Sequence, residues 1–76
     1  MNLMETMDIH SKEGDVVLYN FPFNGYEGDQ ATAAKYLSEG NTYTVDHTIV
    51  YSSSTDVFLK EFPDIAFNSV MFSDYK

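Results

Sequence analysis

Residues 43–61 read YTVDHTIVYSSSTDVFLKE, which is two β-rich runs on either side of three serines. Both runs alternate apolar with polar residues, and this period of two is typical of strands with one buried face. In the first run the predicted buried face comprises Tyr43, Val45, Ile49 and Tyr51. In the second run, from Thr55 to Glu61, it comprises Val57 and Leu59. The serines would make the turn of an antiparallel hairpin.

A short helix is predicted upstream of this hairpin. Asp29 is expected to be its N-cap, since a carboxylate there accepts a backbone N–H of the first turn. Residues 30–39 are rich in helix formers, and Gly40 stands where a left-handed C-cap belongs. The face expected to pack on the sheet comprises Ala33, Tyr36 and Leu37.

Five further segments complete the predicted order. Residues 15–20 (DVVLYN) form a strand, and residues 21–25 (FPFNG) form a turn because they contain Pro and an Asn-Gly pair. Residues 62–64 (FPD) break the sheet pattern, and residues 66–72 form a last strand. Residues 1–12 lack a clear period and are expected to be a loose arm or a short first strand.

The length of 76 residues leaves room for one hydrophobic core, so residues 1–76 are predicted to be a single domain. The fold class is mostly β (α+β): a small SH3-like open barrel or a twisted antiparallel sheet of four to five strands with one short helix. The chain has six Tyr and six Phe but no Trp, so its core should depend on packing between rings.

The charge balance limits the classes of partner that the protein is expected to bind. Twelve Asp and Glu oppose four Lys, and the formal net charge is −8. Such a field repels DNA, RNA and anionic membranes, and it attracts basic proteins with a strength that falls as salt rises. The alternative is an acidic surface that serves solubility alone.

Carboxylates can imitate a phosphate backbone. Alternate residues of a strand project from one face about 6.6 to 6.8 Å apart, and Arg binds carboxylate and phosphate through the same fork. Outward strand positions and turns carry the acids expected to form such a partner-binding face: Glu27, Asp29, Glu39, Asp46, Asp56, Glu61 and Asp64. The alternative is that these charges are scattered.

Catalysis and metal binding have little support in the sequence. Cys is absent, which excludes disulfides, zinc-thiolate sites and thiol nucleophiles. His10 and His47 carry the two imidazoles, and no spacing in the sequence identifies catalytic or metal-binding partners for either side chain. The pair Asp8-x-His10 is weak evidence for a metal site. His47 lies on the same side of the predicted strand as Val45, which favours a partly buried histidine. We therefore expect no enzyme activity, no cofactor and no metal.

Phe21, Phe23 and Tyr26 surround the Asn-Gly turn. They would either anchor a partner or a second copy of the chain, as in a homodimer, or cap the open end of the barrel, and the cap is favoured. The N-terminus lacks the pattern of a secretory signal, and no apolar run approaches the ~20 residues of a membrane span. A cytoplasmic location is the resulting expectation.

Three segments carry a resemblance to a known family. Residues 37–45 (LSEGNTYTV), 57–59 (VFL) and 67–72 (FNSVMF) resemble small bacteriophage and prophage proteins with an SH3-like barrel. The similarity covers roughly the last forty residues, and its motifs are short and core-forming, so they bear on fold more than on function. The helix that precedes them is an insertion that many SH3-like barrels lack.

In length and acidity the whole chain is also similar to the small early proteins with which lytic phages of Gram-positive bacteria disable their hosts, in particular DNA-mimicking inhibitors of the histone-like nucleoid protein HU. That resemblance has no diagnostic motif. It implies a phage protein that occupies the basic DNA-binding surface of HU in the infected host and does not itself bind nucleic acid. The alternative function is a phage adaptor or assembly module that binds another protein through an edge strand or the aromatic loop.

Overall fold

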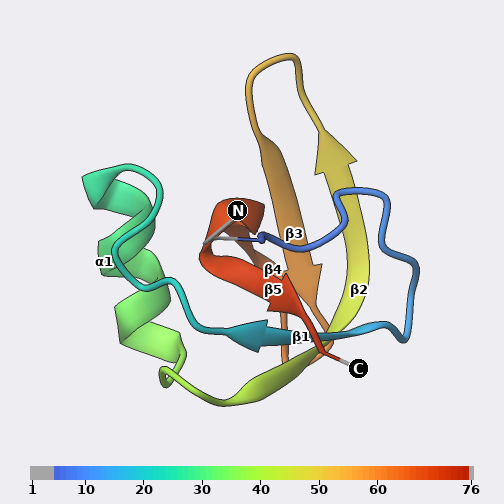
Figure 1. Ribbon diagram of the computed structural model, residues 1–76, viewed down its shortest axis with the longest axis horizontal. Coiled ribbons are helices and arrows are strands. Elements are labelled where there is room, and N and C mark those ends of the chain that lie inside the picture. The colour runs from blue at the N-terminus through green and yellow to red at the C-terminus, as the bar shows by residue number, and fades with distance from the viewer. Residues whose placement is uncertain (1–4, 76) are drawn as a thin grey trace.

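The computed structural model describes residues 5–75, and Figure 1 shows their arrangement. Over this range the elements in chain order are β1 (Val16–Tyr19), α1 (Glu27–Tyr36), β2 (Thr42–Val50), β3 (Thr55–Leu59), β4 (Phe62–Asn68), the 3-10 turn η1 (Ser69–Met71) and β5 (Phe72–Asp74). The prediction of a mostly β fold with one short helix is confirmed.

The five strands form one antiparallel sheet in the order β4-β3-β2-β1-β5. The first part of β2 pairs with β1 and the rest pairs with β3, so β2 belongs to both halves of the sheet. Figure 1 shows β1 and β5 running across the direction of β3. The prediction of an antiparallel sheet of four to five strands is confirmed, with β4 and β5 as its edge strands.

A β-bulge at Asp46 changes which side of β2 faces the core. The register of the β2–β3 pair shifts there, because one extra residue of β2 is accommodated. Tyr43 and Val45, before the bulge, are buried as predicted. Ile49 and Tyr51, after it, are 38% and 54% exposed, so their predicted burial is wrong. The extra residue reverses the alternation, so that Thr48, and not Ile49, lies opposite the buried Val57.

Two predictions for the C-terminal part of the chain are wrong. Residues 62–64 do not break the sheet, because β4 begins at Phe62 and Pro63 lies in an edge strand, where its missing N–H is tolerated. Residues 66–72 are not one strand. The Asn68 side chain accepts a hydrogen bond from the Val70 N–H at 3.2 Å, and the chain makes η1 before β5 starts.

The helix begins three residues earlier than predicted, at Glu27, and its N-cap is Tyr26. Asp29 is therefore not the N-cap. Its Oδ2 atom accepts a hydrogen bond from the Tyr26 N–H at 3.0 Å, so the carboxylate caps the helix from inside the first turn. The same atom accepts a second hydrogen bond from Asn68 Nδ2 at 3.0 Å, which ties α1 to the end of β4.

The helix ends at Tyr36, so Gly40 is not its C-cap. The Ser38 N–H donates to the Tyr43 hydroxyl at 2.9 Å, which removes that amide from the helical pattern. Gly40 instead serves the following turn, with a φ of 90° that favours glycine and an N–H that donates to the Tyr19 carbonyl. Of the predicted packing face, Ala33 and Leu37 are buried, whereas Tyr36 is 38% exposed.

Asp29→Ala is expected to lower the free energy of unfolding by about 1–2 kcal/mol, because it removes the acceptor of both the Tyr26 and the Asn68 hydrogen bonds. Urea unfolding followed by circular dichroism measures the change. Glu27→Ala is the matched control, since Glu27 is an exposed acid in the same turn. Equal losses for the two variants would contradict the capping role.

The described part of the N-terminal segment, residues 5–12, is neither a loose arm nor a strand. Met7 is buried, and its N–H donates to the Phe72 carbonyl at 2.8 Å. The Thr48 hydroxyl donates to the Ile9 carbonyl at 2.9 Å. The segment is therefore held against both β5 and β2. Residues 1–4 of the predicted arm lie outside the described residues.

The core contains side chains from the N-terminal segment, α1, all five strands and η1. Its buried apolar members are Met7, Val17, Tyr19, Ala33, Leu37, Tyr43, Val45, Val57, Leu59, Phe67, Met71 and Phe72. Ring packing runs through it as predicted, with successive ring centroids 5.5, 6.4, 6.3 and 5.8 Å apart along Tyr36, Phe62, Phe67, Phe72 and Tyr19. Val57 and Leu59 of β3 are fully buried, which confirms their predicted face.

Candidate functional site

An acidic cleft lies where the N-terminal segment meets the start of β1 and the end of β5. Its volume is about 290 Å³. The lining residues are Asp8, Ser11, Asp15, Val16, Asp74 and Tyr75. Three of these six residues carry a carboxylate and none carries a cation, so the cleft presents negative charge to solvent.

Each of the three carboxylates is oriented by a backbone amide. Asp8 Oδ1 accepts from the His10 N–H at 2.9 Å, and Asp15 Oδ2 accepts from the Lys12 N–H at 2.9 Å. Asp74 Oδ1 accepts from the Asp8 N–H at 3.2 Å. One oxygen of each group is thus held by the fold, which fixes the direction of the other before a partner arrives.

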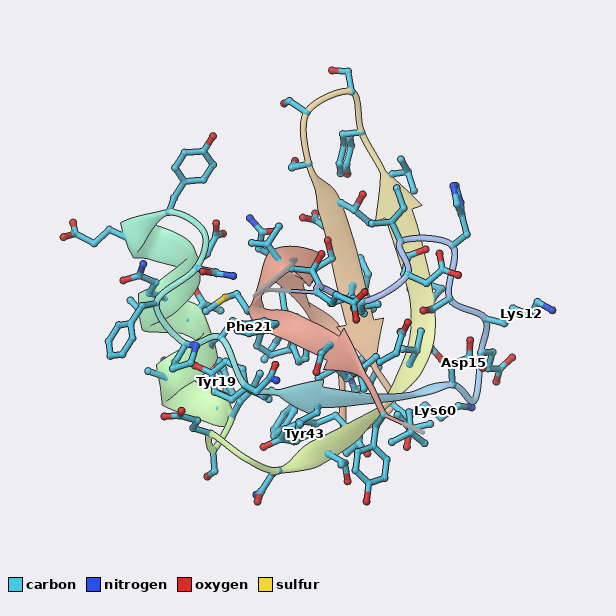
Figure 2. The ribbon with its side chains drawn as sticks, viewed as in Figure 1. Lys12, Asp15, Tyr19, Phe21, Tyr43 and Lys60 are labelled. Atoms are coloured by element: carbon cyan, nitrogen blue, oxygen red, sulfur yellow. The ribbon has the colours of Figure 1, made fainter. Side chains whose placement is uncertain are left out.

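The charge of Lys60 is directed to a partner outside the cleft. Figure 2 shows Lys12, Asp15 and Lys60 on the side of the molecule away from α1. Lys60 Nζ lies 2.6 Å from Glu13 Oε2, and this hydrogen bond raises the pKa of the Lys60 ammonium. The charge of Lys60 is therefore matched by Glu13, which is outside the cleft lining.

Two of the seven acids predicted to bind a partner have structural hydrogen bonds. Asp29 caps α1 and holds Asn68, as described above. Glu61 follows β3, and both its carboxylate oxygens accept from the Thr44 N–H, at 3.0 and 3.1 Å. That contact supports the backbone next to the bulge in β2. A partner would have to compete with these hydrogen bonds.

The other five predicted acids are distributed over different elements. Glu27 is in the first turn of α1, and Glu39 lies in the loop that follows the helix, where its charge adds to the effect of burial in raising the pKa of the Tyr19 hydroxyl. Asp46 is the bulge residue of β2, Asp56 lies on β3, and Asp64 is exposed on β4. Asp56 faces Asn68 across the β3–β4 pair, which places it near the Asp29 contact.

His47 is exposed, so its predicted partial burial is wrong. The bulge turns its side chain to the outer face, where the imidazole stacks on Phe58 with ring centroids 4.4 Å apart. Its Nδ1 atom lies 2.7 Å from Asp46 Oδ2. The ring and the carboxylate form a local pair on the surface of β2.

The acidic cleft was missed by the sequence analysis. Asp8 and Asp74 are 66 positions apart in the chain, and no local pattern links them. The hydrogen bond from the Met7 N–H to the Phe72 carbonyl brings them together, and the pairing of β1 with β5, in which Val17 faces Asp74, adds Asp15. The usable signal was the polar run at residues 8–15, which follows a buried Met7 and leads directly into β1.

The geometry gives no support to a metal centre. Within residues 5–75, no three His, Asp or Glu side chains are positioned to hold a metal ion. The Asp8-x-His10 pair makes a local turn, in which the carboxylate accepts a hydrogen bond from the backbone N–H of His10.

None of the described helices has the length and apolarity needed to cross a membrane.

A second depression, the aromatic groove, lies beside the loop between β1 and α1. It measures about 310 Å³ and is lined by Gly25, Tyr26, Ser53, Ser54, Asn68 and Val70. Phe21 is half-buried, but Phe23 and Tyr26 are 86% and 77% exposed. The prediction that these three rings cap the barrel is therefore wrong for Phe23 and Tyr26, because the loop directs them into solvent.

The fold and surface define a small acidic protein with one antiparallel sheet and one helix, and its described residues form the acidic cleft and the aromatic groove. A family described as Bacteriophage T4 protein Y07B matches residues 8–76, so the chain belongs to this bacteriophage family. No curated protein and no solved structure matches the chain. The phage origin that the sequence resemblance implied is thereby supported.

Proposed function

We propose that the protein is a non-enzymatic inhibitor that imitates DNA and binds the DNA-binding surface of a basic host protein. The observation that carries this proposal is the acidic cleft, in which Asp8, Asp15 and Asp74 are held by backbone amides in a chain of net charge −8. Fixed carboxylates suit a groove whose Lys and Arg are arranged for phosphates.

The first target to test is the histone-like nucleoid protein HU, which the sequence resemblance names. Inhibition would be competitive and would take place in the cytoplasm of the infected host. Affinity would come from several charge-assisted hydrogen bonds, and specificity from the shape of the acidic surface. No cofactor would be needed, and the protein would not bind nucleic acid itself because its charge repels phosphates.

The protein is expected to displace a fluorescently labelled DNA duplex from HU, measured by fluorescence anisotropy. Its own affinity for HU should fall at least about tenfold between about 50 and 200 mM salt, because most of the contacts join opposite charges. A protein of similar size and neutral charge is the control. Failure to displace the duplex, or binding that salt does not change, would refute the proposal.

A second candidate function is a phage adaptor or assembly module that binds another protein through the aromatic loop or an edge strand. The observation that favours it is the exposure of Phe23 and Tyr26, since large rings on one loop are typical anchors of protein interfaces. An adaptor of this kind would not displace DNA from HU. Displacement of the labelled duplex therefore separates the two candidates.

A further inference from the structure

The loop that carries Phe23 and Tyr26 is held in place by hydrogen bonds to its neighbours. Asn24 Nδ2 donates to the Val70 carbonyl at 2.7 Å, and Gln30 Nε2 donates to the Phe23 carbonyl at 2.8 Å. The Tyr26 N–H is bonded to Asp29. The two exposed rings therefore project from an ordered backbone, which lowers the entropy lost when they contact a partner.

The aromatic groove beside these rings has three walls. Gly25 and Tyr26 form the first, the turn between β2 and β3 forms the second through Ser53 and Ser54, and the region of η1 forms the third. Figure 1 shows α1 and the β2–β3 hairpin on either side of η1. A volume of about 310 Å³ is at the small end of ligand pockets, roughly 300 to 1,000 Å³, and suits a few side chains of an extended segment.

The residues that surround the aromatic groove carry negative charge. Glu27 follows Tyr26 directly, and Asp29 is bonded to Asn68, which lines the groove. Asp56 lies opposite Asn68 in the β3–β4 register. None of the described lysines is among the lining residues, and these three carboxylates outweigh the partial positive charge at the N-terminus of α1.

We propose that the aromatic groove binds an extended segment of a partner protein that carries cationic side chains. The rings of Phe23 and Tyr26 would pack on the apolar parts of that segment and attract its Lys or Arg through their faces. The carboxylates of Glu27 and Asp56 would pair with the same cations, while Asp29 would add negative charge and keep its hydrogen bonds to Tyr26 and Asn68. The inference rests on the second candidate function and names the chemistry of its partner. It does not depend on DNA mimicry.

The test uses the pentapeptide acetyl-Arg-Pro-Leu-Pro-Arg-amide, which proline keeps extended. We expect saturable shifts of the backbone amide signals of residues 23–26, 53–54 and 68–70 in NMR spectra of the labelled protein. Phe23→Ala and Tyr26→Ala should each weaken binding about tenfold. Glu13→Gln is the control and should bind the peptide as the natural chain does, because Glu13 lines neither depression and pairs with Lys60.

Three results would overturn the proposal. The first is a set of shifts centred on Asp8 and Asp74, and the second is equal binding of a peptide with Glu in place of Arg. The third is binding that does not saturate by about 5 mM peptide, because such an affinity is too weak for a specific interface. Displacement of DNA from HU by Phe23→Ala is measured in parallel. That readout reports on mimicry alone, so failure of the groove and failure of the DNA-mimic proposal give different results.

Discussion

Phe72→Ala is expected to lower the free energy of unfolding by about 3–5 kcal/mol, a large part of the roughly 5–15 kcal/mol that keeps a small domain folded. The side chain is fully buried, and its ring lies 5.8 Å from that of Tyr19 and 6.3 Å from that of Phe67. Its removal would leave a cavity where β5 meets β1 and β4. A chain of 76 residues has few other contacts to compensate.

The same substitution at Phe23 provides a matched control, because that side chain is 86% exposed and its loss should change stability by less than about 0.5 kcal/mol. Urea unfolding of both variants, followed by circular dichroism, gives the two free energies. Similar losses at Phe72 and Phe23 would contradict the core described above. A selective loss at Phe72 would support the central place of β5 in the fold.

The double variant Asp15→Lys with Asp74→Lys is expected to weaken binding to HU by at least about 100-fold, equivalent to about 2.8 kcal/mol. It replaces two oriented carboxylates of the acidic cleft with cations, so attraction becomes repulsion at the proposed contact. Isothermal titration calorimetry at fixed salt measures the affinity. Thermal unfolding of the variant checks that β5 still pairs with β1.

The control double variant is Asp46→Lys with Asp56→Lys, which changes the net charge by the same amount but lies on β2 and β3. It should weaken binding to HU by less than about tenfold, through long-range charge alone. Equal losses in the two double variants would show that total charge, and not the acidic cleft, determines affinity. A larger loss in the control would move the contact to the face predicted from the sequence.

Much of the secondary structure could be predicted because its signals are local. The hairpin follows from the alternation in residues 43–61, and β3 has the predicted buried face. The helix was predicted from its composition, but its start was misplaced, because Asp29 can cap equally well from outside or inside the first turn. The bulge at Asp46 has no local signal. It depends on pairing of β2 with both β1 and β3.

The candidate sites were predicted less well than the fold. The surplus of acids indicated a basic partner, but Asp29 and Glu61 turned out to hold backbone and side-chain amides of the fold. The aromatic loop was recognised as an anchor or a cap, and exposure of Phe23 and Tyr26 favours the anchor. Which hydrogen bonds a carboxylate makes depends on the neighbours that folding supplies.

By itself the sequence determined the strand alternation, the presence of one helix and the strongly negative charge, since each depends on neighbouring residues or on composition. Only the tertiary structure decided that Asp8, Asp15 and Asp74 share a cleft and that Ile49 faces solvent. The physical reason is that both outcomes depend on contacts between segments that are distant in the chain. Strand register decides which side of β2 carries Ile49, and a hydrogen bond joins Asp8 to Asp74 across 66 positions of chain.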